Sequence, residues 1–207
     1  MSSECSEFII RNLKCHDIQH AVQLQSLCFP PPFDAELLWT REHFESHLAK
    51  IPHLQWVAEH NGVLVATCSN TYITSSTWTE HLSWSETVGG PLLCKHPKGD
   101  LLYGLDISVH PEFRCKGIAS ALYQARKELV VREGLKGYVT GCRIPDYGAV
   151  SSQFSATEFV ERVKIGHCTD RTLSPLLKMG MTLMGVQPDY MDDAESANFA
   201  ALLEWRP

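Results

Sequence analysis

The segment LLYGLDISVHPEFRCKGIASALYQARKELVV, residues 101–131, contains a strand, a tight turn and a helix in succession. Over residues 103–109, apolar side chains alternate with small or polar ones, which is the period of a strand with two different faces. Pro111 prevents the strand from continuing, because proline has no main-chain N–H to donate. From Lys116 onward an apolar side chain recurs every three or four residues, which predicts a helix packed on a sheet.

The turn between the strand and the helix reads Arg114-Cys115-Lys116-Gly117-Ile118-Ala119. The start of a helix offers unpaired main-chain N–H groups and a partial positive charge, and Gly117 lets a ligand approach the main chain closely. Arg114 and Lys116 add two full positive charges. These features predict a pyrophosphate-binding turn. It is neither a P-loop nor a dinucleotide-binding fingerprint, because their glycine patterns are missing. An ordinary strand–helix turn with an incidental arginine and glycine is the alternative.

The composition indicates one globular domain over residues 1–207, with 44% hydrophobic and 20% charged residues. The net charge of −6 argues against a general nucleic-acid binder. No apolar run reaches the length of a membrane span, and the first residues do not resemble a secretory signal. The eight cysteines include no C-x-x-C pair, which favours reduced thiols in a cytoplasmic protein.

Periodicity predicts further elements on both sides of the central segment. We expect strands over residues 8–11, 55–59, 63–68, 136–142, 181–186 and 199–205, and helices over residues 16–28, 41–51, 156–163 and 172–179. Asn61-Gly62 predicts a tight hairpin between two of the strands. Residues 77–87 form either a helix or an ordered loop.

The spacing R-x-x-G-x-A after a strand ending V-x-P-x-x-R resembles the GNAT superfamily of acyl-CoA-dependent N-acyltransferases. The segments CFPPPF, TREHFESHLAK, LSWSETVGG, LYGLDISVHPEFR, GCRIPDY and PDYMDDAESANFAALLEW resemble one GNAT branch, whose members occur alone or fused to a carbon–nitrogen hydrolase (nitrilase-like) domain. The resemblance covers nearly the whole chain. It implies an α/β fold with a mixed, mostly antiparallel sheet, splayed middle strands and helices on both faces.

The resemblance also implies how acetyl-CoA, the expected co-substrate, is bound. The residues Arg114 to Ala119 would hold its pyrophosphate. The main chain of Ile107 and Val109 would pair with the pantetheine arm, and the Val109 N–H would face the thioester carbonyl.

Asp106 lies where many family members carry a strand carboxylate that accepts the amine proton, directly or through water. A carboxylate among apolar neighbours can have a raised pKa and act as a general base. The alternative is a structural carboxylate bonded to nearby N–H groups. Arg143 and Tyr147 follow the strand that should splay from this one, where an acceptor would enter. Arg143 either binds a carboxylate of the acceptor or ties its loop to an acidic surface residue.

Leu176 occupies the position of the family's usual general acid, a tyrosine. Tyr147, Tyr190, Cys142 or water would then protonate the leaving thiolate, or the domain binds acyl-CoA without turnover. His43 and His47 form only half of a metal site, so no metal is expected.

Two functions follow. The first is an acetyl-CoA-dependent N-acetyltransferase that works by direct attack of a small-molecule or peptide primary amine, with Asp106 and Tyr147 as catalytic residues. The second is a non-catalytic acyl-CoA-binding or sensing module that works with a separate carbon–nitrogen hydrolase. A homodimer is compatible with both.

Overall fold

The computed structural model describes residues 8–31, 33–93 and 98–207, so Pro32 of the segment CFPPPF (residues 28–33) lies outside the described residues. The strands form one seven-stranded sheet in the order β1-β2-β3-β4-β5-β7-β6. Their bounds are β1 (Ile9–Asn12), β2 (Gln55–His60), β3 (Val63–Ile73), β4 (Leu101–Val109), β5 (Tyr138–Arg143), β6 (Thr182–Gln187) and β7 (Ala200–Trp205). Neighbouring strands are antiparallel except β4 and β5, which are parallel. This confirms the predicted mixed sheet.

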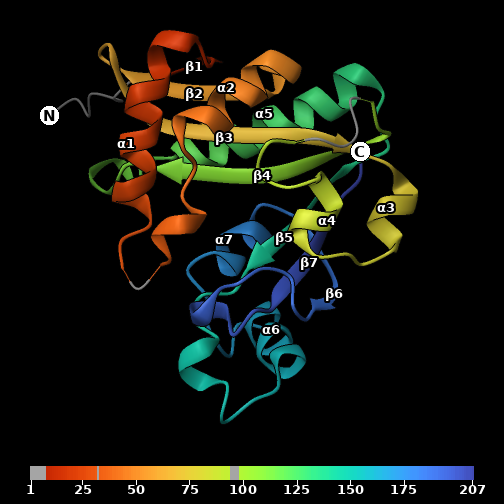
Figure 1. Ribbon diagram of the computed structural model, residues 1–207. Helices are drawn as coiled ribbons and strands as arrows, with labels where there is room; N and C mark the ends of the chain where they lie inside the picture. Colours follow the sequence, from red (N-terminus) through yellow and green to blue (C-terminus); the bar gives the residue numbers. More distant parts are fainter. Residues whose placement is uncertain (1–7, 32, 94–97) are drawn as a thin grey trace, which may run out of the picture.

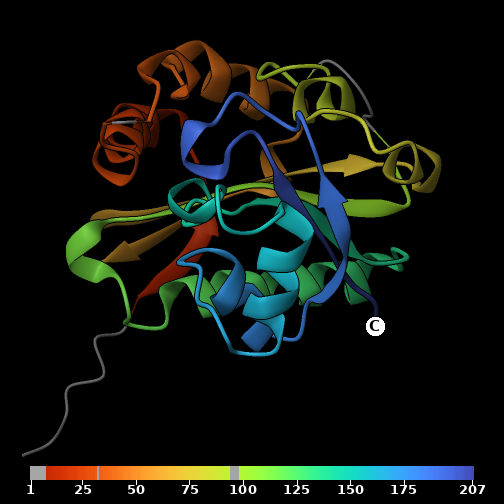
Figure 2. The same cartoon turned by 90° about the horizontal axis from the view of Figure 1, so that it is seen from below.

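Helices cover both faces of the sheet, as Figure 2 shows most clearly. They are α1 (Ile18–Cys28), α2 (Arg41–Lys50), α3 (Ser75–Thr79), α4 (Trp84–Val88), α5 (Ile118–Glu133), α6 (Ala156–Lys164) and α7 (Leu173–Lys178). α1 and α2 lie on one face and α5 lies on the other. We expected either a helix or an ordered loop over residues 77–87. The structure contains both, because a loop separates the end of α3 from the start of α4. None of the described helices is long and apolar enough to cross a membrane.

The hairpin between β2 and β3 forms where the sequence predicts it. Asn61 and Gly62 both have positive φ, 50° and 79°, which is the geometry of a tight turn that matches the twist of its strands. The turn sets the register of β3 against β2, and β3 pairs with β4 along most of its length.

The parallel strands β4 and β5 touch only where they begin (Figure 1). Their register pairs are Leu102 with Tyr138 and Tyr103 with Val139. One residue further on, the Thr140 hydroxyl donates to the Gly104 carbonyl at 2.9 Å. Beyond this point the strands diverge, so the second half of β4 has a free edge. This confirms the predicted splay of the middle strands.

A β-bulge interrupts β4 just before its functional half. Asn70 and Ser69 of β3 pair with Gly104 and Asp106, so that Leu105 is the extra residue. The expectation of unbroken alternation along residues 103–109 is therefore wrong, because a bulge reverses the faces that follow it. A Cβ on Gly104 would meet Tyr138, whereas Asp106 contacts α1 on the opposite face.

Candidate functional site

A cavity of about 460 Å³ lies beside the splayed strands. Its walls come from distant parts of the chain: α1, Phe29, residues 33–43, α4, β4, β5 and the loop 189–198. Leu105 and Asp106 both line it, since the bulge turns two successive residues of β4 towards the same side. The cavity thus lies against the part of β4 that β5 leaves free.

Asp106 presents a carboxylate to this cavity. Its Oδ2 accepts hydrogen bonds from the Ser108 hydroxyl at 2.8 Å and from the Gln25 amide nitrogen at 3.1 Å. Burial raises the pKa of Asp106 to about 6, although these hydrogen bonds and the charge of Arg126 lower it. A carboxyl with this pKa is mostly ionised at neutral pH and is a stronger base than an exposed aspartate.

Gln25 is a site residue that sequence reasoning missed. It lies on α1, is 3% exposed, and its amide nitrogen donates to both Asp106 and the Ser108 hydroxyl. Its position 81 residues before Asp106 gives no local signal. The one hint in the sequence was a polar residue on the otherwise apolar face of this helix, which the structure shows to be buried.

Arg126 is the second missed residue, and it holds the bulge together. This arginine of α5 is 2% exposed, and its Nη2 donates to the carbonyls of Ser69 and Asp106 at 3.1 and 3.0 Å. Its Nε donates to the Asn70 side chain at 2.5 Å, and its Nη1 donates to the Tyr138 hydroxyl at 2.9 Å. One guanidinium thus bridges the two strands at the place where their register shifts.

The start of α5 fits the pyrophosphate of an acyl-CoA. Ala121 is the first residue to donate to the helix, to the Gly117 carbonyl, so the N–H groups before it have no helical acceptor. Gly117 has φ +84°, and a Cβ built there would meet no heavy atom within 4 Å. Cys115, Lys116 and Arg114 are exposed beside it. The start of α5 thus combines open space at Gly117 with main-chain N–H groups that have no acceptor within the helix.

The free edge of β4 leads from this turn to the cavity. The His110 N–H donates to Val65 of β3, so the main-chain groups of Val109 face away from β3, and alternation gives Ile107 the same direction. The Val109 carbonyl accepts from Arg114 Nε at 3.2 Å and from the Cys28 thiol at 3.3 Å. An extended ligand on this edge would reach Asp106 from the turn.

Arg143 lines the cavity, but its charge is already matched. Its Nε and Nη2 bond both oxygens of Asp193 at 2.6 and 2.7 Å, and Nη2 also reaches Glu195 at 3.0 Å. Although burial raises it, these bonds hold the pKa of Asp193 below its ordinary value. The guanidinium also lies 4.8 Å from the centre of the Phe33 ring. Of the two expectations for Arg143, this geometry matches the tie to acidic residues.

The structure does not bring Tyr147 to the cavity. It packs against Phe159 and Phe199, and its hydroxyl donates to the Phe154 carbonyl at 3.2 Å. Tyr190 does line the cavity, and its hydroxyl bonds that of Tyr103.

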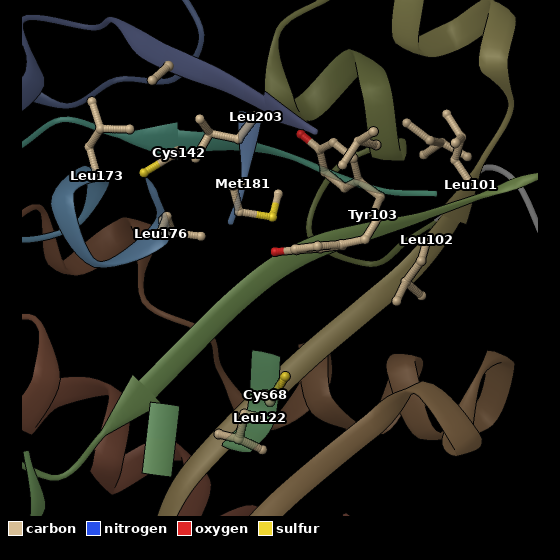
Figure 3. Close-up of a cluster of buried hydrophobic side chains, with 14 of the residues drawn as sticks. Cys68, Leu101, Leu102, Tyr103, Leu122, Cys142, Leu173, Leu176, Met181 and Leu203 are labelled. Atoms are coloured by element: carbon tan, nitrogen blue, oxygen red, sulfur yellow. The ribbon is translucent and has the colours of Figure 1, made fainter. Parts of the chain in front are cut away.

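Leu176, at the position of the family's usual general acid, and Cys142, the remaining candidate for the thiolate proton, both lie in the core. Leu176 is 3% exposed and packs in the apolar cluster with Met181 and Cys142, as Figure 3 shows. Burial raises the pKa of Cys142 well above its ordinary value, so this thiol stays neutral.

His43 and His47 have separate roles. His43 lines the cavity, and its Nδ1 accepts from the Thr40 N–H at 3.1 Å. His47 is fully buried, and its Nε2 lies 2.7 Å from the Pro91 carbonyl. Within residues 8–31, 33–93 and 98–207, no three histidine, cysteine or acidic side chains form a metal-binding cluster.

Comparison with known proteins places this geometry in a family. The family model described as "Acetyltransferase (GNAT) family" matches residues 18–151. The chain is 35% identical over 198 residues to the uncharacterized N-acetyltransferase YkwB of Bacillus subtilis (strain 168), covering 95% of this chain and 88% of YkwB. It is 36% identical over 201 residues to the probable hydrolase YhcX of the same organism, covering 96% of this chain but only 38% of YhcX.

The fold has counterparts among solved structures. The GNAT-like decarboxylase GphF, solved in complex with isobutyryl-CoA, superposes with a TM-score of 0.80 at 22% sequence identity. The match covers 96% of this chain and 98% of that one. At this identity the likeness concerns the fold.

Proposed function

Because the chain belongs to the acetyltransferase (GNAT) family, we propose that it is an acetyl-CoA-dependent N-acetyltransferase whose acceptor is a primary amine. The observation that carries the proposal is the position of Asp106. Its carboxylate faces the cavity at the free edge of β4, and that edge leads to the open N-terminus of α5. Donor, acceptor and base would therefore meet at one place.

Each part of the chain has one task in this reaction. The N–H groups at the start of α5, with Arg114 and Lys116, would bind the pyrophosphate, and the Ile107 and Val109 main chain would hold the pantetheine arm. The Val109 N–H would stabilise the negative charge that develops on the thioester oxygen. As the amine nitrogen bonds the acyl carbon and the carbon–sulfur bond breaks, Asp106 would take the proton of the amine.

The leaving thiolate needs a proton, and we assign its donor to Tyr190. Of the three candidate residues Tyr147, Tyr190 and Cys142, Tyr190 is the one that lines the cavity. Burial raises the pKa of Tyr190 well above its ordinary value, so the phenol carries its proton at neutral pH. The neighbouring Tyr103 hydroxyl can hydrogen-bond the phenolate that forms.

The proposal is tested by measuring free-thiol release from acetyl-CoA over a panel of primary amines, with the amide product identified by mass. We expect thiol and amide in equal amounts, and rates of both that are about 10²- to 10⁴-fold lower in Asp106→Asn. Thiol without amide would indicate thioester hydrolysis and would refute amine transfer.

A second candidate is the acyl-CoA sensing module that works with a carbon–nitrogen hydrolase. It is favoured by Leu176, a buried apolar side chain at the position of the expected tyrosine, and by the likeness to 38% of a probable hydrolase. Tight binding of acetyl-CoA with no thiol release over the whole amine panel would support this function instead.

A further inference from the structure

Resting on the proposed function, we propose that the acceptor is a cationic arylalkylamine, that is, an aromatic body with a primary ammonium group and no carboxylate. An amino acid with the same aromatic group, which carries a carboxylate in addition to the ammonium group, would bind more weakly. The polar atoms, the paired arginine, the rim acids and the aromatic walls each contribute to this inference.

Two oxygen atoms of residues that line the cavity, Gln25 Oε1 and Asp106 Oδ1, accept no hydrogen bond from the described residues. Gln25 is 3% exposed and lines the cavity, and no described residue donates to its Oε1. Among the described residues, Asp106 Oδ1 is likewise without a donor, because its two bonds go to Oδ2. Neither oxygen is among the buried side-chain atoms of the described residues that lack a partner, so both are open to the cavity. A ligand that displaces the water from them should bring N–H groups, since an acceptor buried without a partner costs free energy. An ammonium group or amine supplies them.

A carboxylate would find no unmatched cation among the described lining residues. Arg143 is the one lining arginine, and Asp193 and Glu195 already neutralise it. Burial lowers the pKa of His43, so the ring is neutral at neutral pH, and its Nδ1 lone pair is used by the Thr40 N–H. A carboxylate entering the cavity would lose its hydration without an ion pair.

Acidic side chains form the rim of the same cavity. Glu36, Asp189 and Asp192 are exposed and line it, and none of them pairs with a cation of the described chain. Such charges attract a cation over a few ångströms and repel an anion, and salt screens them. The rim thus favours the same ligand as the interior.

The walls of the cavity suit an aromatic body. They are formed by Phe29, Phe33, Trp39, Trp84 and Leu105. A volume of about 460 Å³ accepts an aromatic ring on a short linker. Aromatic faces also attract an ammonium group through their quadrupole.

The test compares 2-phenylethylamine with L-phenylalanine, which differ by one carboxylate. Their dissociation constants are measured by calorimetry on the full chain saturated with coenzyme A, so that the result does not depend on turnover. We expect the amine to bind at least about tenfold more tightly, because like charges placed together are unfavourable. Equal or tighter binding of the amino acid would overturn the inference.

A charge variant tests the rim separately. Asp189→Asn with Asp192→Asn should weaken amine binding severalfold at low salt and narrow its preference over the amino acid. Glu80→Gln with Glu128→Gln removes the same charge from exposed positions outside the cavity and should change neither constant. Identical constants in the rim variant and the wild type would refute the role of the rim acids.

Turnover separates this inference from the proposed function. If the amine binds selectively and acetyl-CoA releases no thiol, the proposed function fails, and the cationic arylalkylamine stands as the class of ligand that the cavity binds. If both compounds are acetylated with equal kcat/KM, the transferase stands and the substrate class is refuted.

Discussion

Asp106 is kept ionised at neutral pH at a cost in stability. Its pKa is about 6 in the folded protein and close to 3.9 in an unfolded chain. Between these values the folded state binds more protons than the unfolded state, so the free energy of unfolding falls as the pH rises from about 4 to 6. Functional sites commonly carry such local destabilisation.

Asp106→Asn should therefore stabilise the protein in a pH-dependent way. The variant removes the buried charge, so its advantage over the wild type should be absent below about pH 4, grow between about pH 4 and 6, and reach at most about 3 kcal/mol above that range, at 1.36 kcal/mol per pKa unit. Urea unfolding at pH 3.5, 5 and 7.5 measures it. A stability difference that does not change with pH would show that Asp106 has an ordinary pKa.

At the scale of elements, the strand–turn–helix of residues 101–131 was predictable because its signals are local. Alternation, Pro111 and Gly117 act within a few residues of one another. The positions of Asp106 on the strand and of Arg114 in the turn follow from the same local signals, whereas the role of Asp106 as a base was expected from the family resemblance and stays a prediction. Gln25 and Arg126 could not be placed in this way, because their roles depend on which strand lies opposite them, and a bulge depends on the pairing of β3 with β4.

Because Arg126 bonds both strands at the bulge that precedes Asp106, we expect it to act as a positioning residue for that carboxylate. Arg126→Lys keeps the charge but loses the fork that bonds Ser69, Asp106 and Asn70 at once. We expect kcat to fall at least about tenfold while the dissociation constant of coenzyme A stays within twofold, because misplacement at the site costs rate. Arg132→Lys, on the exposed face of the same helix, is the control. Unchanged kcat in Arg126→Lys would show that the bulge holds without the fork.

The turn before α5 predicts a difference between two glycine variants. Gly117→Ala and Gly117→Glu share the strain of a side chain at φ +84°, roughly 1–2 kcal/mol, but only glutamate brings a negative charge and bulk to the pyrophosphate position. Coenzyme A affinity, measured by calorimetry, should fall far more in the glutamate variant. Similar affinities in both variants would mean that the pyrophosphate lies elsewhere.

At the scale of the whole molecule, the cavity is assembled from segments that are far apart in the sequence. In the folded chain, α1, residues 33–43 and the loop 189–198 come together beside the splayed strands of the sheet. For this reason the sequence could name Tyr190 as one candidate proton donor but could not favour it over the others. The sequence also could not decide between the two interpretations of Arg143, because its partner Asp193 lies 50 residues away.

Ligand binding should stabilise the molecule as a unit. A ligand that binds only the folded state adds about 2.7 kcal/mol at a hundredfold excess over its dissociation constant. Acetyl-CoA at millimolar concentration should therefore raise the melting temperature of the wild type and of Gly117→Ala, but not of Gly117→Glu. No shift in the wild type would mean that the turn is not an acyl-CoA site.

The most direct measurement is the pH dependence of kcat/KM for the acetylation of a strongly basic amine, followed by amide formation from pH 5 to 8.5. This constant reports the ionisations of the free enzyme and the free amine. Deprotonation of the amine alone gives log(kcat/KM) a slope of about one. Asp106, with its pKa of about 6, should steepen that slope to about two below pH 6 in the wild type and leave it at about one in Asp106→Asn. If the two proteins give the same profile, Asp106 is not the base.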